Sequence, residues 1–313
     1  MFNKIFSIVG LLILLSTGLG AQDTVFNVDG QKFTLTDAIV RNHFDYKDIL
    51  NRIKLDTSFY KAFKTLRTIG YSSYNYIQMM DENNKLQASL NSKTRQNKIA
   101  GCRTMDVLEE KVTGNLRNNK GDYNYTTPAL YASLFFTKGS ICGETNIVSG
   151  KYRKITGSGI DKAKEQLKML FFNPGKKIAG IPLIGNKLDL YDASAHELYD
   201  YKLDYVNYHG QLVYVFDVQP KSDLGFFAKD RVVVDQMTTW FNPKTLEVIG
   251  RNYSLSYKAG VYDFNVQMEV EMTYFNGMLV PKILRYKGNW DVIFKKRERG
   301  LFTATLFDYK LGQ

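Results

Sequence analysis

The residues that carry catalysis in exported hydrolases occur in this sequence in incomplete motifs. His196 lies in Ala-His-Glu-Leu, which lacks the second histidine of a zinc-protease helix. Ser58 and Lys61 have the Ser-x-x-Lys spacing of an acyl-enzyme nucleophile and its base, but the accompanying motifs are missing. Residues 143–151 have the wrong spacing for a phosphate-binding loop, and residues 157–159, Gly-Ser-Gly, are too short for a nucleophile elbow. These patterns favour a protein without a catalytic centre.

Carboxylates and the remaining histidines do not select a site either. A glycosidase needs two carboxylates several ångströms apart, and the chain has 31 Asp and Glu residues, yet no pattern singles out a pair. His209 falls in a predicted hairpin turn and His43 in a predicted helix. A secreted hydrolase is therefore the third of three functional hypotheses, and we expect neither a cofactor nor a metal.

The two cysteines, Cys102 and Cys142, are expected to form a disulfide. Thiols outside the cytosol tend to oxidise, and a bridge between these positions would remove roughly 4 kcal/mol of unfolded-chain entropy by the loop-closure estimate. Two buried free thiols are the alternative. Metal ligation is disfavoured because no Cys-x-x-Cys pair or histidine cluster accompanies them.

The first 21 residues have the pattern of a cleaved secretory signal peptide. A basic start is followed by an almost wholly apolar run from Ile5 to Leu15 and then by small residues up to Ala21. That run is too short for a comfortable membrane span. We therefore expect residues 22–313 to form a single exported domain in the periplasm, with outer-membrane association or secretion left open.

The chain is basic, with 42 Lys and Arg against 31 Asp and Glu. Loss of Lys4 with the signal peptide leaves 41 against 31, a net charge of +10. Charge of this sign predicts an anionic partner, and for an exported chain an anionic membrane surface or an envelope protein fits better than nucleic acid, which we do not expect. The alternative is that the basic balance only aids solubility.

Three segments have helical patterns with capping residues. Thr36 and Asp37 can cap a helix reaching Ile53, and residues 56–58, Asp-Thr-Ser, can cap a second that ends at Gly70. A third is predicted over 160–172. All three are amphipathic, so they are expected to cover a sheet.

Most of the remaining chain alternates as strands do. Residue pairs such as Asn276-Gly277 and Asn242-Pro243 supply turn chemistry between them. Long twisted antiparallel strands must curl or close. We therefore predict an α+β, β-dominated fold in which a strongly curved antiparallel sheet, a half-barrel meander, wraps around a few amphipathic helices. The predicted extended stretches are 71–80, 85–92, 98–105, 131–137, 145–155, 199–208, 211–219, 230–240, 246–258, 262–275, 278–286, 290–294 and 301–309.

The alternating strands carry one strongly apolar face. Between residues 262 and 274 every second side chain is apolar and most of the others are charged or polar. If the sheet is wide and curved, part of this face can stay open to an apolar guest, to which methionines adapt readily. The alternative is an ordinary core completed by the helices. The candidate ligand-binding residues are Tyr201, Leu203, Tyr214, Phe216, Phe264, Val266, Met268 and Met272.

The segment 171–192 has a Gly- and Pro-interrupted apolar run flanked by lysines. Such a run is typical of a flexible lid that touches a membrane or plugs a cavity mouth, and a buried crossover at the edge of the sheet is the alternative. The candidate lid residues are Ile178, Ile181, Leu183 and Ile184.

Three stretches together resemble the periplasmic lipoprotein carriers and outer-membrane lipoprotein-sorting proteins of Gram-negative bacteria. They are the helix-to-strand segment 59–80, the run VVVDQMTTWFNPKTLEVIGRNYSL and the segment YFNGMLVPKILRY. The stretch from LFFNPGKK to NYHGQLVYVFDVQPK is also similar to large envelope proteins that share this sheet. The resemblance covers roughly residues 60–309 and implies an unclosed barrel that holds acyl chains, without catalysis or cofactor. The chain departs from it by an insertion around Cys102 to Cys142, and no ligand-contacting residue transfers.

These patterns lead to a first hypothesis and one main alternative. The first is an exported, non-catalytic cell-envelope protein that binds a lipid, acyl chain or other apolar ligand in the concave face of its sheet, in outer-membrane lipid or lipoprotein handling. The alternative is an envelope structural or protein-interaction module whose core is filled by its own side chains.

Overall fold

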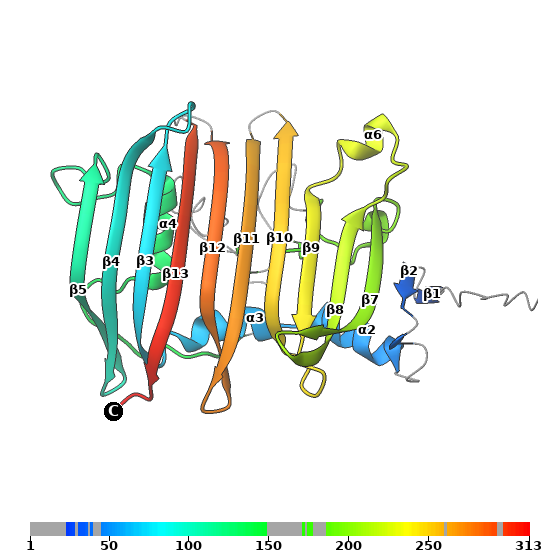
Figure 1. Cartoon of the computed structure of the whole chain (residues 1–313), viewed down its shortest axis with the longest axis horizontal. Coiled ribbons are helices and arrows are strands. Elements are labelled where there is room, and N and C mark those ends of the chain that lie inside the picture. The colour runs from blue at the N-terminus through cyan, green and yellow to red at the C-terminus, as the bar shows by residue number, and fades with distance from the viewer. Residues whose placement is uncertain are drawn as a thin grey trace, which may run out of the picture.

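The strands form one sheet that runs the whole length of the molecule (Figure 1). The structure is a computed structural model, and it describes residues 23–28, 31–36, 38–39, 45–148, 171–172, 174–177, 186–259, 262–292 and 297–313. Within these residues the sheet has thirteen strands in the order β1-β2-β7-β8-β9-β10-β11-β12-β13-β3-β4-β5-β6. It is curved and unclosed, with β1 and β6 at its two edges, so the predicted β-dominated α+β fold is confirmed.

Seven consecutive strands make an antiparallel meander at the centre of the sheet. The last of them, β13, pairs with the much earlier strand β3, and this pairing joins the amino-terminal strands to the meander. The bounds are β7 Tyr199–Tyr208, β8 Gln211–Pro220, β9 Val234–Phe241, β10 Val248–Ala259, β11 Tyr262–Phe275, β12 Met278–Val292 and β13 Glu298–Lys310.

The two ends of the sheet come from earlier parts of the chain. One end continues from β3 (Gly70–Met80) through β4 (Leu86–Ile99) and β5 (Cys102–Gly114) to the short β6 (Ile141–Cys142). At the other end β2 (Gln31–Leu35) runs parallel to β7, and β1 (Thr24–Val28) pairs with β2. The turn residues of the sequence predict neither the β13–β3 pairing nor the parallel β2–β7 pairing. A turn indicates pairing only between two strands that follow each other along the chain.

The hairpin turns have the backbone that their residues favour. Asn276 and Gly277 both have positive φ, 47° and 73°, as a two-residue type I′ turn requires. His209 and Gly210 likewise have φ of 52° and 83°, so His209 lies in the turn where the sequence placed it. These turns fix the register of β11 with β12 and of β7 with β8.

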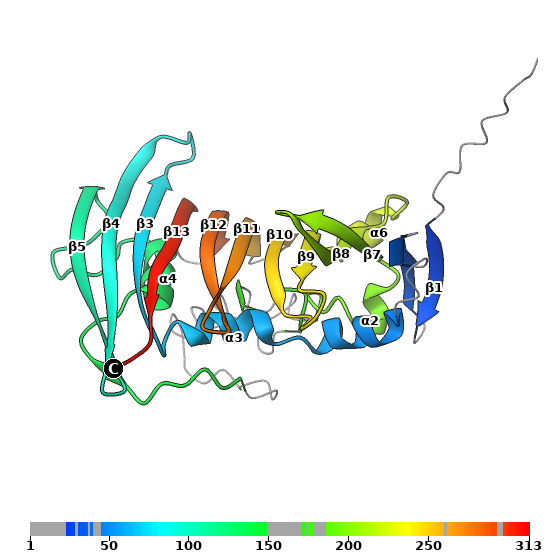
Figure 2. The same cartoon turned by 60° about the horizontal axis from the view of Figure 1, so that its bottom comes forward.

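The helices lie against one face of the sheet, here called the inner face (Figure 2). α3 (Ser58–Thr65) contacts β12 and β10, and α4 (Thr126–Phe135) contacts β13. α2 (Tyr46–Leu55) precedes α3, while η1 (Ala193–Ala195) and α6 (Phe226–Lys229) are short. Asp45 caps α2 by accepting from the Asp48 amide. Residues 38–39, just after the predicted cap at Thr36 and Asp37, are also helical, and the Ile39 amide donates to the Thr36 carbonyl at 3.0 Å.

The sequence prediction for residues 131–137 is wrong, because most of them belong to α4. Its first turn contains Pro128, a residue tolerated there. The carboxylate of Glu298 in β13 accepts hydrogen bonds from the amides of Thr126 and Thr127, at 2.6 and 3.0 Å. This cap comes from a strand 171 residues away, so the local pattern of the helix does not show it.

Other predicted bounds also change. Residues 278–286 and 290–294 were expected as two strands, but β12 runs without a break from Met278 to Val292. Residues 145–148 are not a strand, and 149–155 lie outside the described residues, as do His43 and most of the helix predicted over 160–172. The predicted signal peptide also lies outside them and stays a prediction.

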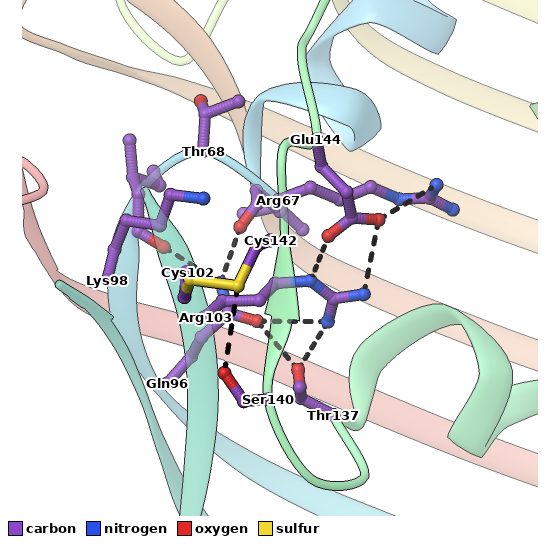
Figure 3. Close-up of polar contacts among 12 residues, drawn as sticks. Arg67, Thr68, Gln96, Lys98, Cys102, Arg103, Thr137, Ser140, Cys142 and Glu144 are labelled. Atoms are coloured by element: carbon purple, nitrogen blue, oxygen red, sulfur yellow. Dashed lines mark hydrogen bonds and ion pairs between the residues drawn. A yellow bond between two sulfur atoms is a disulfide. The ribbon is translucent and has the colours of Figure 1, made fainter. Parts of the chain in front are cut away.

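Cys102 and Cys142 form the predicted disulfide (Figure 3). They face each other across β5 and β6. Beside the bridge, Arg103 donates to Glu144 and Thr137, and Gln96 donates to the carbonyls of Leu66 and Ile69 at 2.6 and 2.8 Å. The cluster therefore fastens the insertion between β5 and β6 to the end of α3.

Candidate ligand site on the inner face of the sheet

Strand register aligns the inner-face side chains in rows that cross the sheet. One row, here the Met268 row, links all strands from β7 to β5 through directly paired positions. Its members are Tyr201, Val218, Met237, Tyr253, Met268, Tyr286, Phe302, Ile77, Leu90 and Val112. All are apolar or aromatic, and all but Val112 are buried. The inner face thus presents a continuous apolar band wider than any helix packed on it.

The next row, here the Arg251 row, is mixed in character. Its members are Leu203, Phe216, Thr239, Arg251, Val270, Leu284, Ala304, Asn75, Ser92 and Glu110. At the β3–β4 end its polar groups are satisfied by α4, since the Tyr131 hydroxyl donates to Asn75 Oδ1 at 2.6 Å. From β7 to β11 the row contains the apolar residues Leu203, Phe216 and Val270. Thr239 and the charged Arg251 lie between Phe216 and Val270.

The eight predicted ligand-binding residues lie on three strands of the meander and are all buried. Tyr201 and Leu203 are on β7, Tyr214 and Phe216 on β8, and the other four on β11. Register pairs Leu203 with Phe216 directly, while β9 and β10 separate the β8 group from the β11 group. Their exposed fractions run from 0% for Leu203 to 9% for Met272. In this structure, therefore, other parts of the protein cover them.

The middle of the inner face is covered by a segment with little regular structure. Phe171 packs on Tyr286 and Phe302, at ring-centroid distances of 5.2 and 6.2 Å, and its carbonyl accepts from the Tyr253 hydroxyl at 3.2 Å. The Leu190 carbonyl accepts from the Tyr201 hydroxyl at 2.7 Å. We call residues 171–172, 174–177 and 186–191 the cover. The predicted lid residues Ile178, Ile181, Leu183 and Ile184 lie outside the described residues.

Gly175 lets the cover approach the sheet closely. Its φ is +81°, and a Cβ at this position would lie 2.9 Å from a Leu190 methyl and 3.1 Å from the Met237 methyl. The Leu190 amide donates to the Gly175 carbonyl at 3.0 Å, which closes the two arms of the cover on each other. A side chain at this position would be strained both in its backbone and in its contacts.

Burial also sets the protonation of the inner face. It raises the pKa of Tyr201 and of Tyr253 well above the usual value of a phenol. Both hydroxyls therefore stay protonated and donate to carbonyls of the cover. The aromatic part of the face is uncharged at every physiological pH.

Arg251 is a charged residue on the inner face that the sequence reading did not select. It lies on β10 between Thr239 of β9 and Val270 of β11. The sequence already indicates this orientation. Arg251, Tyr253, Leu255 and Tyr257 are alternate residues of one strand, so their side chains point to the same face. It is 9% exposed, and burial lowers its pKa.

Two of the hollows at the surface of the described residues lie away from the inner face, and neither contains any of the eight predicted residues. One, of about 310 Å³, lies between the α2–α3 junction and the β9–β10 turn. The other, of about 210 Å³, lies at the ends of β3, β4 and β13. Both have mixed polar and apolar linings, so they do not have the character of an acyl-chain site.

The incomplete catalytic motifs have structural roles where the structure describes them. The Ser58 hydroxyl accepts a hydrogen bond from the Val248 amide at 2.8 Å, which ties the start of α3 to β10. Within the described ranges no cluster of three or more His, Cys, Asp or Glu side chains could hold a metal ion. No described helix is long and apolar enough to cross a membrane.

Comparison with known proteins gives matches at the level of structure. No family model and no curated protein sequence matches the chain. A DUF1329 family protein from Desulfovibrio piger is similar at 12% identity with a TM-score of 0.28, covering 83% of this chain and 92% of that chain. A putative outer membrane lipoprotein-sorting protein domain from Vibrio parahaemolyticus is similar at 8% identity with a TM-score of 0.26, covering 81% and 92%. The chain thus resembles the groups that its sequence motifs indicated, at a level that says nothing of what it binds.

Proposed function

We propose that this protein is an exported, non-catalytic cell-envelope protein that holds an acyl chain or another apolar ligand against the inner face of its sheet. In this role it would take part in the handling of outer-membrane lipids or lipoproteins in the periplasm. The observation that supports the proposal best is the Met268 row, an apolar band across ten strands, of which α3 and α4 cover only part. Phe171 covers it at β12 and β13, and the irregular segments 174–177 and 186–191 cover it at β7 and β9.

The cover is held mainly by side chains. On the sheet these are the Phe171 ring, Leu190, two hydrogen bonds from tyrosine hydroxyls, and Lys187, which donates to the Tyr257 hydroxyl at 2.9 Å and lies over its ring. Phe172 also packs on the Tyr60 and Phe63 rings of α3. Segments with few backbone hydrogen bonds belong to the least stable parts of a protein and open first. A guest that takes the place of the cover would meet the same aromatic and methionine side chains, which adapt their packing to varied shapes.

The energies favour exchange of part of the cover for a long acyl chain. Burial is worth about 0.8 kcal/mol for each CH₂, so a chain of about twelve carbons contributes roughly 9 kcal/mol. Exposing a large apolar side chain costs about 3 kcal/mol at most, and the cover buries four of them, Phe171, Phe172, Leu188 and Leu190. A long chain can therefore displace two of these side chains with a surplus but not all four, and a short one cannot displace two.

A separate surface suits an anionic membrane as the partner. Phe226 and Phe227 are 76% and 85% exposed at the α6 tip, which projects beyond the end of the sheet (Figure 1). Lys229 lies two residues after Phe227, and Arg231, which pairs with Glu197 at 3.4 Å, follows after Asp230. Adjacent exposed aromatic rings with cations beside them are typical of segments that insert between acidic lipid head groups.

The test of ligand carriage uses the exported protein and one matched pair of variants. Native mass spectrometry of the purified protein, before and after extraction with organic solvent, should detect a co-purifying acyl species. A fluorescent fatty acid should bind the extracted protein, and Met268→Glu should abolish binding because it places a charge in the middle of the apolar band. Gln267→Glu adds the same charge on the opposite, exposed side of β11 and should bind normally.

Two outcomes would contradict the proposal. One is a wild-type protein that carries no acyl species and ignores the probe after extraction. The other is a folded Met268→Glu variant whose probe affinity equals that of Gln267→Glu, which would move the site away from the inner face. Circular dichroism and thermal unfolding establish that each variant is folded.

A second candidate function, a protein-interaction module with a self-filled core, is favoured by two observations. The eight predicted residues are already buried by the protein itself. In addition, among the described residues β5 pairs on its outer side with β6 over Cys102 and Arg103 alone, and Val107 and Leu108 beyond that pairing are exposed. An exposed strand edge can accept an extended segment of another protein. Ligand-free wild-type protein that ignores the probe would favour this function.

A further inference from the structure

The inner face contains a buried cation with no counter-ion in contact. Arg251 Nε donates to Thr239 Oγ1 at 3.1 Å, and the guanidinium carbon lies 4.5 Å from the centre of the Phe59 ring of α3. Among the described residues this is the one hydrogen bond that the guanidinium makes, and no carboxylate oxygen of those residues lies within 4.0 Å of it. The two Nη atoms make no hydrogen bond to the described residues, and neither is fully buried, so both can be reached from solvent although the residue is only 9% exposed.

The nearest carboxylates are engaged elsewhere. Asp56 acts on Arg251 through space, but its Oδ1 accepts from the Ser58 amide at 2.9 Å. Asp189, in the cover, accepts from the amide of Tyr191 at 3.0 Å. Each of these bonds fixes a local turn of the chain, and neither carboxylate lies within 4.0 Å of the guanidinium.

A second cation lies close to the first. Lys176 of the cover is partly buried and donates from Nζ to the Asp56 carbonyl at 2.5 Å. Burial lowers its pKa most, and the charge of Arg251 also lowers it, while Asp56 and Asp189 raise it. These two carboxylates offset only part of the cost, because burial still leaves the pKa of both cations lowered, and an anion in contact with both would reduce that cost.

We propose that Arg251, assisted by Lys176, binds the anionic head group of the ligand. This inference rests on the proposed function and narrows the ligand to an amphiphile with a long apolar tail and an oxyanion head, either carboxylate or phosphate. The planar guanidinium binds two oxyanion oxygens at once, which no other side chain on the face can do. The tail would lie along the neighbouring Val270 and Met268 of β11, beneath the position that Phe171 occupies.

The alternative role for Arg251 is structural, with the guanidinium stacked on Phe59 to hold α3. The two roles differ in a measurable way. A structural arginine affects every ligand equally through the fold, whereas a head-group anchor affects charged ligands and leaves neutral ones unchanged. The comparison therefore needs ligands that share a tail and differ in the head.

The experiment measures the affinities of the extracted protein for dodecanoate, dodecyl phosphate and 1-dodecanol by displacement of a fluorescent probe, with inorganic phosphate as the tail-less ligand. Wild-type protein should bind the two anionic ligands at least tenfold more tightly than the alcohol. Arg251→Met should lose that preference while its affinity for the alcohol stays within twofold. Arg251→Lys should keep part of it, and Arg285→Met, which removes an exposed cation from β12, should behave as wild type.

Several results would overturn the inference, and they can be told apart from failure of the proposed function. Equal wild-type affinities for dodecanoate and dodecanol would show that the protein binds the apolar tail and does not recognise the charge of the head group. An unchanged preference in Arg251→Met or Arg251→Lys places the anchor elsewhere. Phosphate binding as tightly as dodecyl phosphate shows a site for a free anion.

If wild-type protein binds none of the tailed ligands, both the function and the inference fail. The wild-type comparison decides the head-group preference even if Arg251→Met does not fold.

Discussion

The hydroxyl of Tyr286 occupies the space that a side chain at Gly288 would need, since a Cβ built at position 288 would lie 1.8 Å from the Tyr286 oxygen. Both residues point to the inner face of β12. The Tyr286 ring stacks on Phe302 at a centroid distance of 4.5 Å and an interplanar angle of 15°, and Phe171 of the cover packs on it from above. The strand runs unbroken through a glycine because a neighbouring ring fills the gap.

Gly288→Ala should therefore destabilise the protein. The added methyl group has to displace the Tyr286 ring from its stack, and overpacking of this kind costs about 1–3 kcal/mol. Urea unfolding should show the loss as a lower midpoint. Lys287→Ala, on the exposed side of the same strand, is the control and should change stability by less than about 0.5 kcal/mol. If the two variants unfold alike, the tyrosine has another position available.

Replacement of both cysteines by serine should cost about 4 kcal/mol, the loop-closure value for a bridge that spans 40 residues. The Arg103 contacts with Glu144 and Thr137 do not need the bridge, so the variant should still fold. Urea unfolding with and without reductant checks this. Reductant should lower the midpoint of the wild type and leave that of the variant unchanged, and an equal shift in both would show that the bridge is not the cause.

Asp235 should make stability depend on pH in an unusual direction. Burial in β9 raises its pKa above the usual 3.8, against the hydrogen bonds it accepts from Ser256 and Ser254. The folded state thus holds a proton that the unfolded state has released, so this group's contribution to stability is full below about pH 3.8 and is lost as pH rises through the folded pKa. The wild-type free energy of unfolding minus that of Asp235→Asn should fall as the pH rises above about 3.8 and level off once the folded-state carboxyl has also ionised. Asp200→Asn, at an exposed position, should show no such fall.

The exposed rings of α6 should bind a lipid surface. Phe226→Ser with Phe227→Ser should reduce co-sedimentation with phosphatidylglycerol vesicles at least fivefold, and binding of the wild type should weaken with added salt because anionic head groups contribute. Leu212→Ser is the control, since Leu212 is 53% exposed at the opposite end of β8. Wild-type protein that binds phosphatidylcholine and phosphatidylglycerol equally, or not at all, would contradict an anionic membrane as the partner.

Features that depend on residues close together along the chain could be predicted from the sequence. Alternation predicts which side chains of β11 point to the inner face, and Asn276-Gly277 predicts the turn that follows it. The disulfide followed from compartment chemistry. These features need no knowledge of the rest of the fold.

What the sequence did not show depends on partners far along the chain. α4 was predicted as a strand because its cap, Glu298, belongs to β13. The eight candidate residues lie on buried strand faces, but alternation cannot tell whether a guest or the protein's own cover buries them, so their role as ligand contacts stays a prediction. Arg251 was passed over because a charge in an alternating strand is ordinarily assigned to water.

The pairing of β13 with β3 also sets the order in which the molecule can be completed. Strands β3 to β5 leave the ribosome early and the β7–β12 meander late, and the two halves have no strand in common until β13 arrives. Until then β3 and β12 each present an unpaired row of backbone N–H and C=O groups, and pairings over such long sequence separations form slowly. A nascent chain of this design therefore keeps two open strand edges until β13 is made.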